Sequence, residues 1–287
     1  MSSAKASKGN GFKKFFAFKR KTLAIPYFVF LLLFVLIPIL IIVVYAFTET
    51  IVLPDGSESL QISGKAFLSF FSSKTKLNVL VVSLYIGLLN TIICLLIGYP
   101  IAYLLADKKV NQNYVMVMLF IMPMWINFVL RTGATRDVLA WLGLYGGQHP
   151  YVATMIGMVY NYLPFTILPL YSTMIKLDKA QIEAARDLGC NGPQTFFKSV
   201  LPQSIPGIVA AAEMVFMPTM SSYVISDTLS EGKLTLFGNI IYLNFSQYMW
   251  NEGSFMALIM LALIFITMFA TKRFRKEESQ KKGVGLW

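Results

Sequence analysis

Residues 177–202 read LDKAQIEAARDLGCNGPQTFFKSVLP, a polar stretch that lies between two long apolar segments of the chain. Asp178 is placed to cap a helix, with Gln181 three residues further on in the pattern of a capping box. Gly189 is placed to end this helix in a left-handed turn, and the Gly-Pro pair that follows opens a second helix. The stretch therefore predicts two short helices around a glycine turn.

The first of these helices has the surface of a protein-binding element. Ala184, Ala185 and Gly189 give it a smooth side on which another protein can approach closely. Its charged residues, which stand at helical spacing, are Glu183, Arg186 and Asp187.

The rest of the chain has the composition of a protein that crosses a membrane several times. Of its 287 residues, 56% are apolar, 14% are aromatic and 14% are charged, which is typical of polytopic membrane proteins. Six stretches are long enough, at roughly 17 to 25 residues, to cross a hydrocarbon layer as helices. We place these spans at 23–47, 79–106, 114–130, 152–175, 205–225 and 255–270. The expected fold class is all-α, with six transmembrane helices, of which the fourth and fifth contain helix-breaking prolines.

Lys and Arg are distributed unevenly along this pattern. Residues 1–22 form a basic arm, 23–271 one transmembrane domain and 272–287 a basic tail. With the six spans as placed, 19 of the 25 Lys and Arg residues lie on the side of both termini, which is also the side of residues 177–202. Positive loops are retained in the cytoplasm, so we expect both termini and residues 177–202 to be cytoplasmic. The arm is expected either to lie on the inner leaflet as an interfacial helix or to form a disordered tail.

Composition and motifs also exclude several classes of function. The net charge of +11 lies mostly next to membrane spans, where it sets topology and meets anionic headgroups, so nucleic-acid binding is not expected. The two cysteines, Cys94 and Cys190, indicate no structural disulfide, and His149 has no neighbours at metal-ligand spacing. The sequence lacks a Gly-Lys-Ser/Thr phosphate loop, HExxH and GxSxG. We therefore expect no catalytic site, no metal and no bound nucleotide.

The polar stretch resembles the EAA loop of ABC importer permeases. The resemblance lies in Glu183-Ala184-Ala185, in Gly189 and in Leu201-Pro202, in both residues and spacing. It departs at Ser199, where the family usually has isoleucine. In that family the loop is a coupling helix that inserts into a cleft of the ATP-binding subunit. The coupling residues that the resemblance implies are Glu183, Ala184, Ala185, Arg186, Asp187, Gly189 and Pro202.

The resemblance covers most of the chain, from about residue 79 to 270. Residues 122–131, 160–171 and 206–227 are similar to spermidine/putrescine permeases. This similarity implies a type I ABC importer permease fold in a bacterial cell membrane, with polyamine import by alternating access. It implies a second homologous permease, two ATP-binding subunits that hold ATP and Mg, and an extracellular or periplasmic binding protein as partners, besides membrane lipid. Related permeases carry iron, thiamine, sulfate or phosphonates, so another small solute remains an alternative.

A passage for a polyvalent ammonium needs carboxylates, carbonyls and aromatic faces. Glu213 lies inside the fifth apolar stretch, where a carboxylate marks a transport path unless it sits at the membrane edge or pairs with another subunit. Asn127 and Asn161 are amides that need partners when buried, and Arg131 accompanies Asn127 at the end of the third span. The predicted pathway residues are Glu213, Asp227, Tyr223, Trp125, Asn127, Tyr160 and Asn161.

Three further hypotheses follow from the pattern of spans and loops. The loop 49–77 is predicted to dock a substrate-delivering protein. Two rival classes also stay open, a polytopic membrane enzyme and a channel or ion-driven carrier. Co-purification with an ATP-binding subunit distinguishes both from an importer permease.

Overall fold

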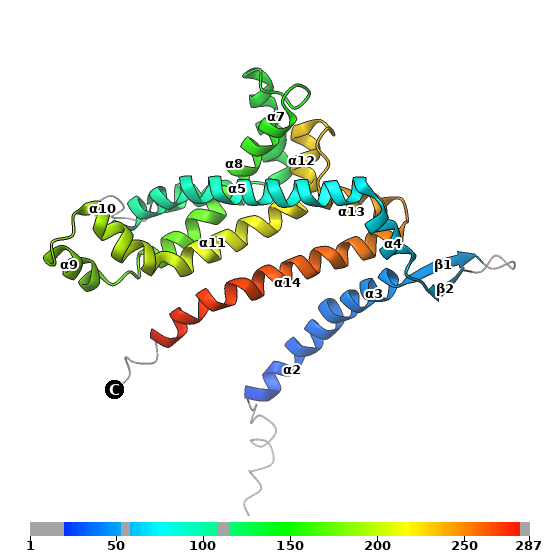
Figure 1. The fold of residues 1–287 in the computed structure, drawn as a ribbon, viewed down its shortest axis with the longest axis horizontal. Coiled ribbons are helices and arrows are strands. Elements are labelled where there is room, and N and C mark those ends of the chain that lie inside the picture. The colour runs from blue at the N-terminus through cyan, green and yellow to red at the C-terminus, as the bar shows by residue number, and fades with distance from the viewer. Residues whose placement is uncertain (1–19, 53–57, 108–114, 282–287) are drawn as a thin grey trace, which may run out of the picture.

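The structure, a computed structural model, describes residues 20–52, 58–107 and 115–281. Apart from one β-hairpin and the connecting turns, it consists of helices (Figure 1). Most of the predicted basic arm (1–19) and the last residues of the tail (282–287) lie outside the described residues.

Five helices are long and apolar enough to cross a membrane, and a bent pair of helices supplies a sixth candidate span. The five cover Ile25–Ala46, Lys74–Ala106, Pro150–Met174, Gly192–Ser221 and Trp250–Lys272. The predicted all-α class with six spans is confirmed when the bent pair counts as one span. The fifth and sixth spans begin earlier than predicted, at Gly192 and Trp250. Each helix starts in a polar segment that the apolar pattern did not include.

The first span leads into the hairpin. This span consists of α2 (Arg20–Leu31), the π-helical turn η1 (Leu32–Leu36) and α3 (Ile37–Ala46). The antiparallel strands β1 (Thr48–Val52) and β2 (Glu58–Ile62) follow, with Thr48 opposite Ile62. The short helix α4 (Lys65–Ser72) then leads to the second span. The all-α prediction had omitted this hairpin.

Three helices pack together at the centre of the molecule: α5 (Lys74–Ala106), α8 (Pro150–Met174) and α11 (Leu201–Ser221). Small residues let their backbones approach closely. A Cβ atom on Gly98 would lie 2.8 Å from the side chain of Thr166, so a larger residue would require Thr166 to move. A buried hydrogen bond of 2.8 Å, donated by Asn90 to Thr219, also joins α5 to α11.

The predicted third span, 114–130, is wrong as a single helix. It begins as α6 (Val115–Ile121) and the 3₁₀ turn η2 (Met122–Trp125), and then turns by 96° into α7 (Phe128–Trp141). Asn127 causes the break, because its side-chain oxygen accepts the N–H of Val129 at 2.9 Å and caps a new helix.

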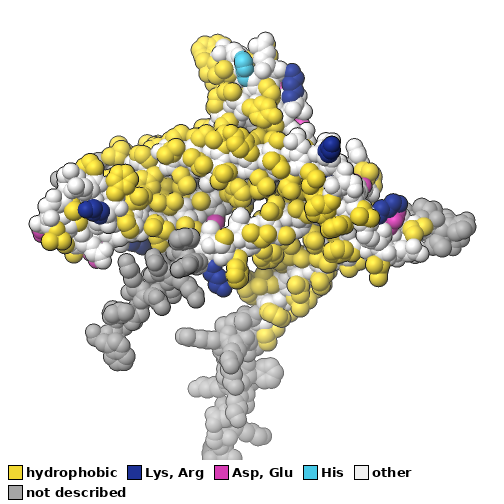
Figure 2. All heavy atoms as spheres, viewed as in Figure 1, with side chains coloured by type: hydrophobic (Ala, Val, Ile, Leu, Met, Phe, Trp, Pro, Cys, Tyr) yellow, Lys and Arg dark blue, Asp and Glu magenta, His cyan; other side chains and the backbone are white. Residues whose placement is uncertain are grey.

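The last part of the chain forms α12 (Tyr223–Ser230), α13 (Phe237–Ser246) and α14 (Trp250–Lys281). α14 packs against α3 and α11. The predicted prolines interrupt neither helix, since α8 continues through Pro164 and Pro169 and α11 continues through Pro218. Figure 2 shows hydrophobic side chains over most of the visible face of the long helices, as expected for surfaces that face lipid.

Candidate coupling surface and transport pathway

The segment with the EAA pattern lies at one end of the molecule, opposite the β-hairpin (Figure 1). It contains α9 (Lys179–Asp187) and α10 (Gly192–Thr195). The side chain of Asp178 accepts the N–H of Ala180 at 3.0 Å and so caps α9. The capping box predicted for Asp178 is absent here. A complete one forms at the second helix instead, where Asn191 and Gln194 exchange bonds of 3.0 and 3.1 Å.

Gly189 ends α9 as predicted. Its φ of +85° lies in the left-handed region. The N–H of Gly189 donates to the carbonyl of Arg186 at 2.8 Å, and the N–H of Cys190 donates to that of Ala185 at 3.1 Å. This pair of bonds is a Schellman motif, which satisfies the last carbonyls of the helix.

The surface of α9 is open along its whole length, since none of its residues is buried. The exposed members of the predicted coupling set are Glu183, Ala184, Arg186, Asp187, Gly189 and Pro202, while Ala185 is half-buried. Two large apolar side chains beside them are also exposed, Leu188 at 86% and Phe197 at 64%. Apolar side chains bordered by charges are typical of a protein-binding surface.

α9 is tied to the membrane helices through Gln203. Its side-chain oxygen accepts the N–H of Asp178 at 3.0 Å, and its nitrogen donates to Ser199 at 3.2 Å. Ser199 lies in the π-helical turn η3 (Phe196–Val200), which joins α10 to α11. The second predicted short helix is therefore the beginning of the fifth span rather than a separate element.

α11 and the turn η3 before it contact α5 at this end of the molecule. The hydroxyls of Tyr99 and Ser204 lie 2.8 Å apart. The ring of Phe196 makes edge contacts with Tyr99 and Tyr103, at centroid distances of 5.7 and 6.3 Å. A continuous set of contacts therefore runs from α9 to both α11 and α5.

The second candidate site is a cavity of about 460 Å³ beside the bend between η2 and α7. Trp125, Asn127 and Asn161, three of the predicted pathway residues, line it. Tyr162 and Ile225 are further lining residues. The hydroxyl of Tyr162 donates to the carbonyl of Pro218 at 3.1 Å and so links α8 to α11. The structure thus brings together residues that are distant in the sequence.

Arg131 is the residue that sequence reasoning underestimated. It is 7% exposed, and its Nε donates to the side-chain oxygen of Asn161 at 2.8 Å. Its guanidinium carbon lies 5.6 Å from the ring centroid of Tyr160. An arginine within an apolar stretch is the signal that marks such a site, but its pairing with Asn161 depends on the fold.

Four other predicted pathway residues do not line this cavity, namely Tyr160, Tyr223, Asp227 and Glu213. Tyr223 stacks on Tyr242 of α13, with the ring centroids 4.4 Å apart, and Asp227 is exposed. Glu213 is half-buried on α11 and accepts a hydrogen bond from Thr271 of α14. Their roles in transport stay predictions.

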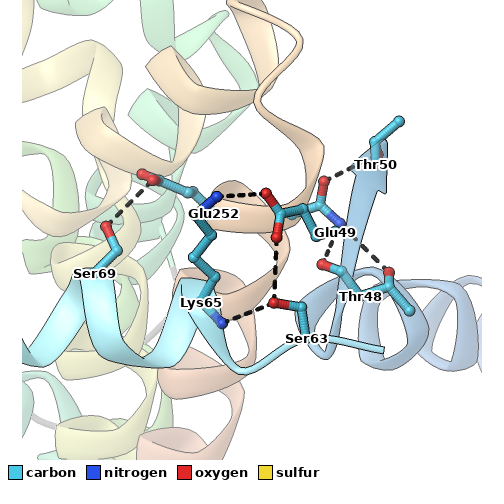
Figure 3. Close-up of polar contacts among 8 residues, drawn as sticks. Thr48, Glu49, Thr50, Ser63, Lys65, Ser69 and Glu252 are labelled. Atoms are coloured by element: carbon cyan, nitrogen blue, oxygen red, sulfur yellow. Dashed lines mark hydrogen bonds and ion pairs between the residues drawn. The ribbon is translucent and has the colours of Figure 1, made fainter. Parts of the chain in front are cut away.

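A cluster of polar side chains anchors the hairpin to α4 and α14 (Figure 3). Lys65 pairs with Glu49 at 2.6 Å, and Lys76 pairs with Glu252 at 2.6 Å. Asn251 donates to the carbonyl of Thr48 at 2.6 Å. The hydrogen bond from Lys65 lowers the pKa of Glu49 below its usual value. These contacts hold the two strands against α4 and α14, while residues 53–57 of the loop that was predicted to dock a delivering protein lie outside the described residues.

The similarity to known proteins covers nearly the whole chain. A family model described as "Binding-protein-dependent transport system inner membrane component" matches residues 88–277. The spermidine/putrescine transport system permease protein PotB of Haemophilus influenzae is 34% identical over an alignment 281 residues long. The alignment covers 92% of this chain and 96% of that protein. PotB of Escherichia coli is also 34% identical, over 68% of this chain and 78% of that one.

Solved structures share the fold at low sequence identity. A chain of a bacterial ABC transporter involved in the import of the acidic polysaccharide alginate superposes with a TM-score of 0.60 at 15% identity. The match covers 88% of this chain and 94% of that one. The solved structures show the fold, and the matched family model with the PotB relative of Haemophilus influenzae establishes that the chain belongs to the family of binding-protein-dependent transport system inner membrane components.

Proposed function

We propose that this chain is a permease subunit of an ATP-driven importer that moves spermidine, putrescine or a similar polyamine into the cell by alternating access. The observation that carries the proposal is helix α9, which has no buried residue, with the EAA residues along it and the Schellman turn at Gly189 at its end. The substrate class is supported by the relatives, which are named spermidine/putrescine permeases.

The proposed assembly contains this chain, a homologous second permease, two ATP-binding subunits and an extracellular or periplasmic binding protein. ATP and Mg are held by the ATP-binding subunits, and this chain carries no catalytic site and no cofactor. The distribution of Lys and Arg supports an orientation in which both termini and α9 face the cytoplasm. The coupling residues Glu183, Ala184, Ala185, Arg186, Asp187, Gly189 and Pro202 then face the ATP-binding subunit.

The conformational change follows from the contacts between the helices. Closure of the ATP-binding subunits moves α9, and Gln203 passes this movement to η3 and α11. α11 contacts α8 through the bond between Tyr162 and Pro218, next to the cavity that Asn161 lines. Each ligand drives the cycle only by binding the two conformations unequally, so ATP and the loaded binding protein favour different states.

The cavity offers groups that suit an alkylammonium. Amide oxygens, a hydroxyl and aromatic faces can replace the water around such a cation. We assign Trp125, Asn127 and Asn161, which line this cavity, to the pathway, together with Tyr160, whose ring lies against Arg131 beside it. Glu213, Tyr223 and Asp227 complete the predicted set, with Asp227 at a surface from which a carboxylate attracts cations.

Two measurements test the proposal. The first is co-purification with the ATP-binding subunit, which Glu183→Ala should reduce, while the control Asp137→Ala, an exposed acid on α7, should not. The second is uptake of radiolabelled spermidine and putrescine by cells that have no other polyamine importer, which should fall when this chain is deleted. Transport without any ATP-binding subunit would contradict the coupling role. Unchanged polyamine uptake would remove the substrate assignment alone.

A further inference from the structure

Two cavities meet at the side chain of Arg131. One is the cavity of about 460 Å³ described above, and the other, of about 580 Å³, lies along α7. Arg131 and Ile126 line both of them, while Asn161 lines only the first and Tyr160 only the second. Arg131 therefore borders both spaces.

The partners of Arg131 are the kinds of group that bind an alkylammonium. Its Nε donates to the amide oxygen of Asn161 at 2.8 Å, and its Nη1 donates to the carbonyl of Pro123 at 2.5 Å. The ring of Tyr160 provides an aromatic face at 5.6 Å, in the range of a cation-π contact. In this conformation, Arg131 occupies a site that a substrate ammonium could fill.

Within the part of the chain that the structure describes, no ion pair joins Arg131 to a carboxylate. The ion pairs among the described residues join Lys65 to Glu49, Lys76 to Glu252 and Arg136 to Asp137. The groups bonded to Arg131 are neutral dipoles. A buried cation held in this way repels other cations, as arginines do in selective pores.

We propose that Arg131 is a gate that mimics the substrate. Its guanidinium closes the passage between the two cavities while no polyamine is present, and a substrate ammonium displaces it from Asn161 and from the carbonyl of Pro123. The inference rests on the proposed function, and it adds the residue that keeps small cations out of a pathway built for large ones.

A purely structural role makes a different prediction. The same bonds join α7 and α8 to η2 across the 96° bend, so Arg131 could act only as a positioning residue for this bend. In that case any substitution would destabilise the complex and weaken substrate binding. A gate instead predicts ion leakage and tighter apparent binding in a complex that stays assembled.

The test uses the complete transporter in proteoliposomes loaded with K⁺, without ATP and without polyamine. Arg131→Gln should raise K⁺ efflux by about tenfold or more, because the charge barrier is lost. Arg131→Lys keeps the charge but not the forked geometry, and should leak less than Arg131→Gln. Arg136→Gln, an exposed arginine on the same helix, is the control and should leave efflux unchanged.

A second readout separates the gate from a structural role. If substrate competes with Arg131 for one site, Arg131→Gln should lower the KM for spermidine several-fold, because the competing occupant is removed. K⁺ efflux equal to that of the wild type in Arg131→Gln, or a raised KM together with a lowered melting temperature, would overturn the gate. The efflux assay contains no polyamine, so leakage in a complex that fails to transport spermidine would contradict the proposed substrate and not the gate.

Discussion

The side chain of Gln203 accepts a hydrogen bond from the backbone N–H of Asp178, the residue that caps α9, with the two atoms 3.0 Å apart. Twenty-five residues separate the two in sequence, yet this bond joins the start of α9 to the membrane helix α11. The amide nitrogen of Gln203 donates a hydrogen bond to the hydroxyl of Ser199 in η3. One side chain thus bonds both to the start of α9 and to the turn that leads into the fifth span.

Replacing Gln203 by alanine should therefore uncouple transport from ATP hydrolysis. The change removes two hydrogen bonds at a partly exposed site, each worth about 1 kcal/mol, and leaves the surface of α9 intact. We expect normal co-purification of the ATP-binding subunit and a several-fold fall in spermidine taken up per ATP hydrolysed. Gln148→Ala, at an exposed glutamine in the loop between α7 and α8, should change neither quantity. Loss of co-purification in Gln203→Ala would place Gln203 in the interface instead.

The left-handed turn after α9 gives a test with a matched control. Gly189 and Gly192 both have open space where a Cβ atom would lie, but only Gly189 has a positive φ. Gly189→Ala should cost about 1 kcal/mol through backbone strain and weaken binding of the ATP-binding subunit. Gly192→Ala should leave binding close to that of the wild type. Equal binding by the two variants would show that the turn contributes nothing to the coupling surface.

Asn161 is the residue on which the pathway site depends. Asn161→Ala leaves the buried Nε of Arg131 without its acceptor, which costs about 1 to 3 kcal/mol, and also removes an amide that lines the cavity. We expect a lower melting temperature of the complex and a raised KM for spermidine. Asn78→Ala, at an exposed position of α5, should alter neither. An unchanged KM in Asn161→Ala would exclude Asn161 from the pathway.

The two lysines beside the hairpin should differ in their contribution to stability. Lys76, at 20% exposure, bonds to both Glu252 and Ser69, and Lys76→Met should lower stability by about 1 kcal/mol. Lys65 is 72% exposed, so Lys65→Met should lower the melting temperature at neutral pH by less than Lys76→Met does. A larger loss from Lys65→Met than from Lys76→Met would contradict this order.

The pKa of Glu49 gives the pH dependence of this cluster. Because Lys65 lowers the pKa of Glu49 in the folded protein, the ion pair contributes at neutral pH and is lost as the pH falls through that lowered pKa, below the ordinary value of 4.5. The difference in melting temperature between wild type and Glu49→Gln should therefore shrink in acid. A difference that stays constant from neutral pH to below pH 4.5 would contradict the assignment.

Local patterns predicted the local structure well. Gly189 ends a helix in a left-handed turn, and the apolar runs form membrane-length helices, because both depend on neighbouring residues and on the solvent. Asn127 shows the limit of this approach. The apolar pattern carries the third span through it, whereas its side chain caps a new helix and bends the chain.

Contacts between distant segments could not be predicted in this way. Arg131 and Asn161 lie 30 residues apart, and only the packing of α7 on α8 brings them within 2.8 Å. Glu213 is a similar case, because its hydrogen bond comes from Thr271 at the far end of the chain. A charge in an apolar stretch indicates that a partner exists, but not which one.

The π-helical turn η3 has a consequence for how this protein tolerates changes in length. The N–H of Leu201 bonds to the carbonyl of Phe196, five residues back, so the turn holds one residue more than an α-helical turn would. Deleting one residue between Phe196 and Val200 would give an unbroken α-helix, but it would rotate everything before the turn by about 100° around the helix axis. The helical phase that points α9 in its present direction is thus set by a single surplus residue.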